Sequence, residues 1–67
     1  MAELKNNIKR YRAQAKMRQE DLAEAVGVTR QTIIAVEKGG YVPSLELGLK
    51  IAKALNQPID KIFSYED

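Results

Sequence analysis

Two short helical patterns separated by one glycine constrain this chain more than any other feature of its sequence. Over residues 19–26 the apolar side chains recur on one helical face, and the pattern stops at Gly27. Glycine tolerates the left-handed backbone with which helices commonly end, and Thr29 has a side chain suited to the N-cap of a new helix. That new helix is expected over about residues 29–38, where Gly39 ends it in the same way.

The spacing of side chains around Gly27 predicts how these two helices pack. Ala23, four residues before Gly27, is small enough for a close crossing, and Ile33, six residues after Gly27, anchors the second helix. Two helices joined by a glycine-containing turn of about three to four residues form a helix-turn-helix, whose second helix can enter the major groove of DNA. The sequence therefore predicts a helix-turn-helix over about residues 19–38. The seam between its helices is completed by Leu22, Val26, Val28 and Val36.

Further helical patterns flank this unit on both sides. An amphipathic helix is predicted over about residues 2–15. Ser44 is a good N-cap for a fourth helix that Asn56 closes, and Pro58 suits the first turn of a short fifth helix. The tail from Ser64 is expected to fray. The apolar stripe of the first predicted helix consists of Leu4, Ile8, Tyr11 and Ala15.

The sequence as a whole predicts one all-α domain over residues 1–67. It contains no alternation typical of strands, no internal repeat and no linker. A chain of 67 residues can bury one core, and short connections between about five helices favour a compact bundle. Because the sequence ends at residue 67, we expect no effector-sensing domain.

Composition argues against several classes of function. The chain has no Cys and no His, which removes disulfides, zinc–cysteine sites and histidine-based acid–base chemistry. Its carboxylates are spread over helix surfaces without a nucleophile and a base at a useful spacing, so we expect no enzyme, no metal and no cofactor. Residues 1–11 lack the apolar region of a signal peptide, and no stretch approaches the roughly 18 apolar residues of a spanning helix. We therefore expect a cytoplasmic protein without a membrane partner.

Charge is unevenly distributed along the chain, although the net charge is only +2. Residues 5–18 hold six basic side chains and no acidic one, whereas residues 60–67 hold three acidic side chains and one lysine. Taken alone, such a basic run is best explained as a solvated helix face. It nevertheless indicates where a polyanion would bind, if the protein binds one.

The pattern around Gly27 resembles that of the Cro/cI-type, or XRE-like, helix-turn-helix regulators of phages and prokaryotes. In that family the pattern is roughly Q-x-x-L-A-x-x-x-G-V-[ST]-x-x-x-I-x-x-[ILV]-E. The resemblance covers about residues 5–63 and implies the five-helix bundle of the phage-repressor DNA-binding domain. The positions that match the pattern are Gln19, Leu22, Ala23, Gly27, Val28, Thr29, Ile33, Val36 and Glu37.

This resemblance implies a set of DNA-contacting residues. Gln19 corresponds to a residue that binds a backbone phosphate, and Arg30, Gln31 and Thr32 to residues that contact base edges or the backbone beside them. Without the resemblance, Arg30 and Gln31 are equally well explained as solvated polar side chains. The DNA-binding candidates are Arg18, Gln19, Thr29, Arg30, Gln31, Thr32, Ala35, Lys38 and Tyr41.

Several positions depart from the family pattern or allow two interpretations. Arg18 stands where the family has Thr, Ser or Asn, so the second helix loses a common cap worth about 1 kcal/mol, and Arg18 is expected to reach a phosphate instead. Ala35, beside Ile34, contacts a thymine methyl group or simply fills the helix. Tyr41 contacts a phosphate or covers the core. Arg12 and Glu37 match positions that commonly form a partly buried ion pair.

The resemblance implies that the protein is a transcriptional regulator. We expect a repressor that binds a pseudo-palindromic operator in double-stranded DNA as a homodimer. We expect no small-molecule ligand. The alternative is a protein-interaction module on the same fold, either an antitoxin or a bridging factor. Apolar residues near the C-terminus form the expected dimer contact, although they are equally suited to the core of one chain. These residues are Leu55, Ile59, Ile62, Phe63 and Tyr65.

Overall fold

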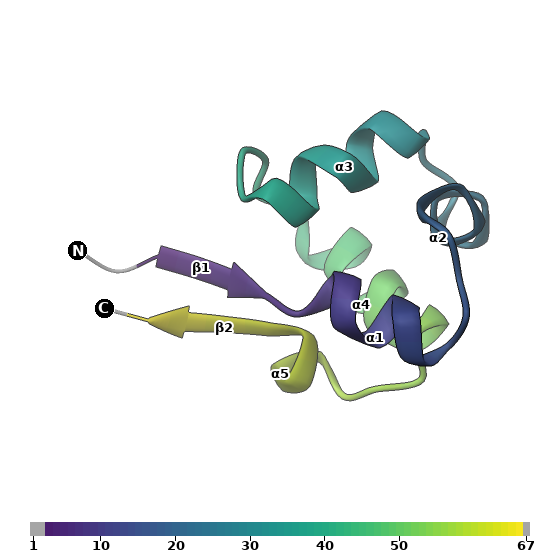
Figure 1. The fold of residues 1–67 in the computed structure, drawn as a ribbon. Coiled ribbons are helices and arrows are strands. Elements are labelled where there is room, and N and C mark those ends of the chain that lie inside the picture. Colours follow the sequence, from purple (N-terminus) through teal and green to yellow (C-terminus); the bar gives the residue numbers. More distant parts are fainter. Residues whose placement is uncertain (1–2, 67) are drawn as a thin grey trace.

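A computed structural model describes residues 3–66 as five helices and two short strands. Ala2, at the start of the predicted first helix, and the acidic Asp67 lie outside the described residues. Within residues 3–66, the helices lack the length and hydropathy that a membrane span requires. In chain order the elements are β1 (Glu3–Asn6), α1 (Ile8–Gln14), α2 (Gln19–Val26), α3 (Arg30–Lys38), α4 (Leu45–Ala54), α5 (Ile59–Ile62) and β2 (Phe63–Glu66) (Figure 1).

The helices enclose one core, and α3 lies along the outside of the molecule (Figure 1). In the same view, α2 crosses near the start of α3, while β1 and β2 extend together from the opposite end of the helical body. Each of the five helices contributes at least one of the largest fully buried side chains. Every helix is therefore anchored in the core. These side chains are Ile8, Leu22, Ile33, Val36, Ile51 and Ile62.

The two strands correct the prediction that the fold is all-α. β1 and β2 pair antiparallel, with Leu4 opposite Tyr65 and Asn6 opposite Phe63. The ladder continues where the amide of Asn7 donates to the carbonyl oxygen of Ile62 at 2.8 Å. The predicted first helix is therefore shorter than expected, since residues 3–6 are a strand, and the tail from residue 64 is paired rather than frayed.

The turn between α2 and α3 is closed at both ends by the predicted residues. Gly27 has a φ of 75°, in the left-handed region, and the amide of Val28 donates to the carbonyl oxygen of Ala23 at 3.0 Å. No atom lies within 4 Å of where a Gly27 side chain would begin, so glycine is needed for its backbone and not for space. The Thr29 hydroxyl then accepts from the amide of Thr32 at 3.3 Å, which confirms Thr29 as the N-cap of α3.

Two other helices end in the left-handed conformation without a glycine. Lys16, after α1, and Asn56, after α4, both have a φ of 57°. Asn56 closes α4 as predicted, because the next amide, that of Gln57, donates to the carbonyl oxygen of Ala52 at 3.0 Å. Asparagine tolerates this conformation better than lysine does, so the backbone at Lys16 is strained.

Most residues expected at a dimer contact belong to the core of the single chain. Leu55 and Ile62 are buried, and Ile59 and Phe63 pack against the core from its edge. The burial of Leu55 and Ile62 favours the second of the two expectations, that they belong to the core of one chain, because side chains exposed by 4% or less offer little surface to a second chain. Tyr65 alone of this group is exposed, at 76% of its surface.

Candidate nucleic-acid interface

The first turn of α3 presents polar side chains to solvent. Arg30 and Gln31 are exposed, whereas Ile33 and Val36, on the opposite side of the helix, are buried and fix its orientation. Ile34 and Ala35 are half-buried and both have apolar side chains, so the middle of α3 offers little polar chemistry of its own. The outward face of α3 therefore begins with a guanidinium and an amide, the two groups that bind purine edges in the major groove.

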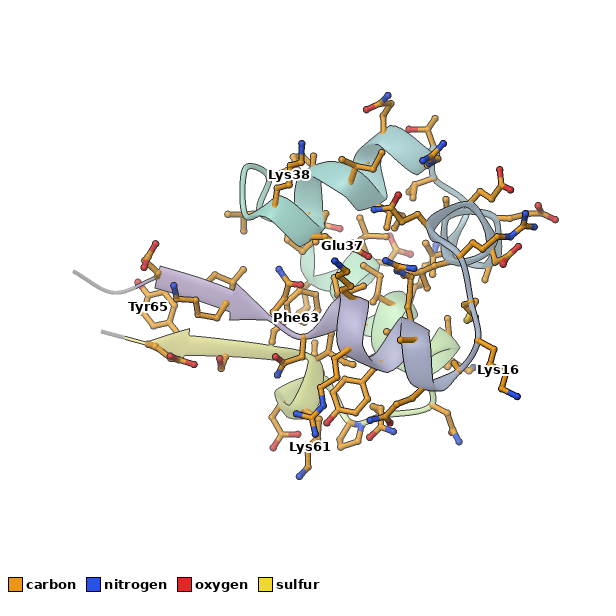
Figure 2. The ribbon with its side chains drawn as sticks, viewed as in Figure 1. Lys16, Glu37, Lys38, Lys61, Phe63 and Tyr65 are labelled. Carbon is orange, nitrogen blue, oxygen red and sulfur yellow. The ribbon has the colours of Figure 1, made fainter. Side chains whose placement is uncertain are left out.

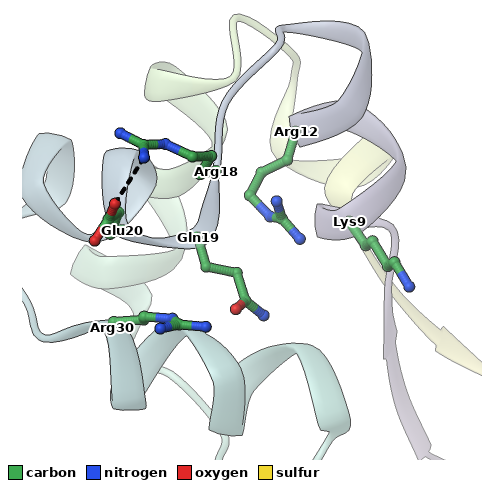
Figure 3. Close-up of a pocket in the computed structure, with 6 residues that line it drawn as sticks. All are labelled: Lys9, Arg12, Arg18, Gln19, Glu20 and Arg30. Atoms are coloured by element: carbon green, nitrogen blue, oxygen red, sulfur yellow. Dashed lines mark ion pairs between the residues drawn. The ribbon is translucent and has the colours of Figure 1, made fainter.

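Beside this turn lies a basic cleft, defined by the six residues that line it. α1 contributes Lys9 and Arg12, the start of α2 contributes Gln19 and Glu20, and α3 contributes Arg30, with Arg18 at the N-cap of α2. Figure 3 shows the Gln19 side chain extending between Arg30 on one side and Lys9 and Arg12 on the other. Four cations and one carboxylate make this cleft attractive to an anion.

Ion pairs compensate two of the four cations that line the cleft and leave the other two uncompensated. Arg12 pairs with Glu37, and Arg18 pairs with Glu20 at 2.9 Å. Among residues 3–66, neither Lys9 nor Arg30 has an ion-pair partner. Lys9 and Arg30 therefore supply the positive potential of the basic cleft. Lys9 belongs to the basic run of the sequence but is absent from the family-derived candidates.

Arg12, Glu37 and Gln19 form one hydrogen-bonded network behind the basic cleft. Arg12 Nε donates to Glu37 Oε2 at 2.7 Å, and Arg12 Nη2 donates to Glu37 Oε1 at 3.2 Å. Gln19 Nε2 donates to the same Oε1 at 3.2 Å. The two charged side chains are only 12% and 10% exposed. Glu37, in the last turn of α3, thus fixes the positions of two side chains that line the cleft.

The start of α2 is stabilised in a way that the sequence pattern did not predict. The Asp21 carboxylate accepts the backbone amide of Arg18 at 2.8 Å and the Arg18 guanidinium at 3.2 and 3.1 Å. These hydrogen bonds lower the pKa of Asp21. The bond from the Arg18 side chain has the larger effect, and the bond from the Arg18 backbone amide has the next largest. The predicted loss of a cap at Arg18 is therefore partly offset by Asp21. The guanidinium of Arg18 faces carboxylates, which weakens the case for its binding a phosphate.

The remaining candidates lie at the rim of this surface. Thr29 and Thr32 hydroxyls lie 3.2 Å apart, and Thr29 is already occupied as a cap. Lys38 projects outward from the far end of α3, whereas Lys61 projects from α5 on the other side of the molecule (Figure 2). Tyr41 is 49% exposed in the loop after α3, so it does not cover the core as a buried lid.

Asn6 is a positioning residue that sequence reasoning missed. Its side-chain Nδ2 donates to the carbonyl oxygen of Val36 at 3.0 Å, near the end of α3. Its Oδ1 accepts the amide of Ile8 at 3.2 Å, at the start of α1. One side chain thus satisfies backbone groups of two helices. The sequence gives only part of the signal, because asparagine is common at helix starts but the partner of Asn6 on α3 lies 30 residues away.

Comparison with known proteins agrees with this geometry. The family model described as helix-turn-helix matches residues 8–62. An HTH-type transcriptional regulator of Methanocaldococcus jannaschii is 58% identical over 64 residues, which cover 96% of this chain and 97% of the relative. The phage CTXphi transcriptional repressor RstR of Vibrio cholerae is 36% identical over 59 residues, covering 88% of this chain and 53% of RstR.

A solved structure supports the same assignment. The restriction-modification controller protein C.AhdI from Aeromonas hydrophila superposes with a TM-score of 0.76 at 31% identity, covering 81% of this chain and 82% of that protein. Sequence, fold and the arrangement of α2 and α3 therefore lead to one assignment. The chain belongs to the helix-turn-helix family of transcriptional regulators.

Proposed function

We propose that this chain binds double-stranded DNA at specific sequences by placing α3 in the major groove. One observation carries the proposal, namely that the exposed start of α3 adjoins the basic cleft and that Arg30 belongs to both. Arg30 is suited to guanine and Gln31 to adenine, because each can form two hydrogen bonds with the edge of that base. The bases would then be read next to a phosphate contact that fixes the register of the protein on the duplex.

The basic cleft is the proposed phosphate site. Lys9 and Arg30 bring uncompensated charge, and the Gln19 amide lies between them. Gln19 donates one hydrogen of its amide to Glu37, which leaves the second hydrogen for a phosphate oxygen. The N-terminus of α2 adds the favourable end of a helix dipole, although the carboxylates of its first turn reduce that contribution.

The regulator is proposed to act as a homodimeric repressor on a pseudo-palindromic operator, with residues 1–67 as a single DNA-binding domain. One α3 reaches only a few base pairs, and two copies related by a two-fold axis would read half-sites about one helical turn apart. The name of RstR, a transcriptional repressor, favours repression over activation.

Selection of bound duplexes from a random pool, followed by fluorescence anisotropy at several salt concentrations, tests this proposal. We expect an enriched, roughly palindromic sequence and an affinity that falls with salt at a slope of about 0.9 per phosphate neutralised. A scrambled duplex of equal length and composition is the control. Equal binding to both duplexes, or an affinity that does not respond to salt, would contradict the proposal.

A further inference from the structure

Ile34 is a large apolar side chain that the core of the protein does not use. It lies in the middle of α3 and is half-buried. Within residues 3–66, six half-buried hydrophobic side chains pack against the core, and Ile34 is not one of them. Those six are Tyr11, Met17, Val28, Ala54, Ile59 and Phe63. The partial burial of Ile34 therefore comes from other neighbours.

These neighbours are polar, and with Ile34 they line a second cleft, here called the Ile34 cleft. The residues that line it are Lys9, Arg12, Gln19, Ile34, Glu37 and Lys38. The Ile34 cleft adjoins the basic cleft, because Lys9, Arg12 and Gln19 line both. Ile34 is the only apolar residue among those that line either cleft. Its side chain is thus surrounded by the groups proposed to bind phosphate.

The charges of the Ile34 cleft favour a DNA backbone as its occupant. Arg12 and Glu37 compensate each other through their ion pair. Lys9 and Lys38 have no ion-pair partner among residues 3–66, so the cleft keeps two free cations. Figure 2 shows Lys38 projecting outward from α3. An anionic strand that passes these two lysines would run beside Ile34.

Filling of the helix surface does not explain an isoleucine at this position. A β-branched side chain loses rotamer freedom in a helix, so alanine, lysine or glutamine would form the same surface at less cost. Single apolar residues are ordinary on protein surfaces, but Ile34 stands on the helix that is proposed to enter the major groove. It follows Arg30 by four residues, which places the two on the same side of α3.

An apolar side chain beside phosphate-binding groups has one match in the major groove. The C5-methyl group of thymine is the apolar group that the base edges present there, and it lies on the side of the base that is nearest the backbone of its own strand. Isoleucine cannot form side-chain hydrogen bonds, so it cannot read the other base edges. Four residues of helix span about 6 Å, which exceeds the 3.4 Å between successive bases. Ile34 therefore meets a different base pair from the one that Arg30 reads.

We propose that Ile34 determines a preference for thymine by contacting its C5-methyl group. The inference deepens the proposed function and rests on it, because it requires α3 to lie in the major groove. It adds an apolar readout to the polar readout by Arg30 and Gln31. Ala35, the other apolar residue in the middle of α3, lines neither cleft.

Replacement of thymine by uracil in the selected operator tests this contact. Uracil lacks only the C5-methyl group and keeps every hydrogen-bonding group of thymine. Each thymine is replaced in turn, together with its symmetry-related copy in the other half of the operator, and anisotropy measures the affinity. We expect one position at which uracil weakens binding about tenfold, because each half of the operator then loses one buried methyl group.

Variants of the chain assign this loss to one side chain. Ile34→Ala is expected to bind the original operator about as weakly as the unmodified chain binds the uracil form, and to bind both forms equally. Ile34→Val keeps a branched apolar side chain and should retain part of the difference. Leu49→Ala is the matched control, since it shortens an exposed apolar side chain of α4 that lines neither cleft. It is expected to retain the full difference, and circular dichroism checks that all three variants are folded.

The outcomes separate this inference from the proposed function. An operator without thymine, uracil forms that all bind like the original, or a difference that persists in folded Ile34→Ala would overturn the role of Ile34. Each of these results would leave sequence-specific binding intact. Failure of the unmodified chain to enrich any duplex would instead overturn the proposed function.

Discussion

Arg12 and Glu37 join the first helix to the last turn of α3 through a two-point contact, with 2.7 Å between Nε and Oε2 and 3.2 Å between Nη2 and Oε1. Gln19 donates to the same carboxylate at 3.2 Å. Since both side chains of the pair are largely buried, the interaction is shielded from solvent and its geometry is well defined. Glu37 thereby couples the orientation of α3 to the shape of the basic cleft.

Replacing Glu37 is expected to reduce both stability and DNA binding. Glu37→Ala leaves the Arg12 guanidinium buried without its partner, which costs about 3 to 5 kcal/mol of unfolding free energy. Urea denaturation measures this loss, and anisotropy measures the accompanying loss of operator affinity. The double variant Arg12→Met/Glu37→Met has no unpaired charge, so it is expected to be more stable than Glu37→Ala. Unchanged melting of Glu37→Ala would show that the pair does not support the fold.

Lys9 is expected to contribute charge and no sequence preference. Lys9→Ala removes one of the two uncompensated cations of the basic cleft. Its affinity should fall by a similar factor for every duplex, and the slope of log affinity against log salt should decrease by about 0.9. Lys61→Ala, on α5, is the control and is expected to leave the slope unchanged. A loss confined to one sequence would instead place Lys9 against a base.

The hydrogen bonds to Asp21 predict a pH dependence. Because the folded pKa of Asp21 lies below its unfolded value, the stabilisation is present above the unfolded pKa and is lost as the pH falls through the folded one. Asp21→Asn should therefore melt at a lower temperature than the unmodified chain at neutral pH, and the difference should vanish in strong acid. NMR titration of Arg18→Ala is expected to show a higher pKa for Asp21. A difference in melting that is constant with pH would contradict this account.

The left-handed conformation of Lys16 predicts a stabilising substitution. Lys16→Gly relieves the strain of a φ of 57° at an exposed position, and we expect a gain of about 0.5 to 1 kcal/mol. Lys16→Ala removes the same charge but keeps a side chain, so it controls for electrostatics and should give no such gain. Thermal melting compares the two variants, and equal stability would show that the strain is negligible.

The parts of the fold that were predicted correctly depend on local chemistry. Gly27 and Thr29 determine the turn between α2 and α3 through the conformation of one residue and the hydroxyl of another, and both signals lie within the segment itself. The same is true of Ser44, whose hydroxyl accepts the amide of Leu47 at 3.1 Å at the start of α4. Such features can be recognised without knowing the rest of the molecule.

The parts that were missed depend on contacts between distant residues. Leu4 continues the helical stripe of residues 8–15 in the sequence, yet it pairs with Tyr65 at the other end of the chain. Periodicity also cannot say whether an apolar residue faces its own core or a second copy, which is why Ile62 was ambiguous until its burial was known. Asn6 was missed for a related reason, since its partner Val36 lies 30 residues away.

The central claim is that the first turn of α3 reads DNA sequence, and the double variant Arg30→Ala/Gln31→Ala tests it most directly. Competition anisotropy between the selected operator and its scrambled control gives the ratio of the two affinities. We predict that this ratio falls from its original value to near one, since each base contact of this kind is worth about 1 to 3 kcal/mol of discrimination. A double variant that is folded and keeps the original ratio would contradict the claim.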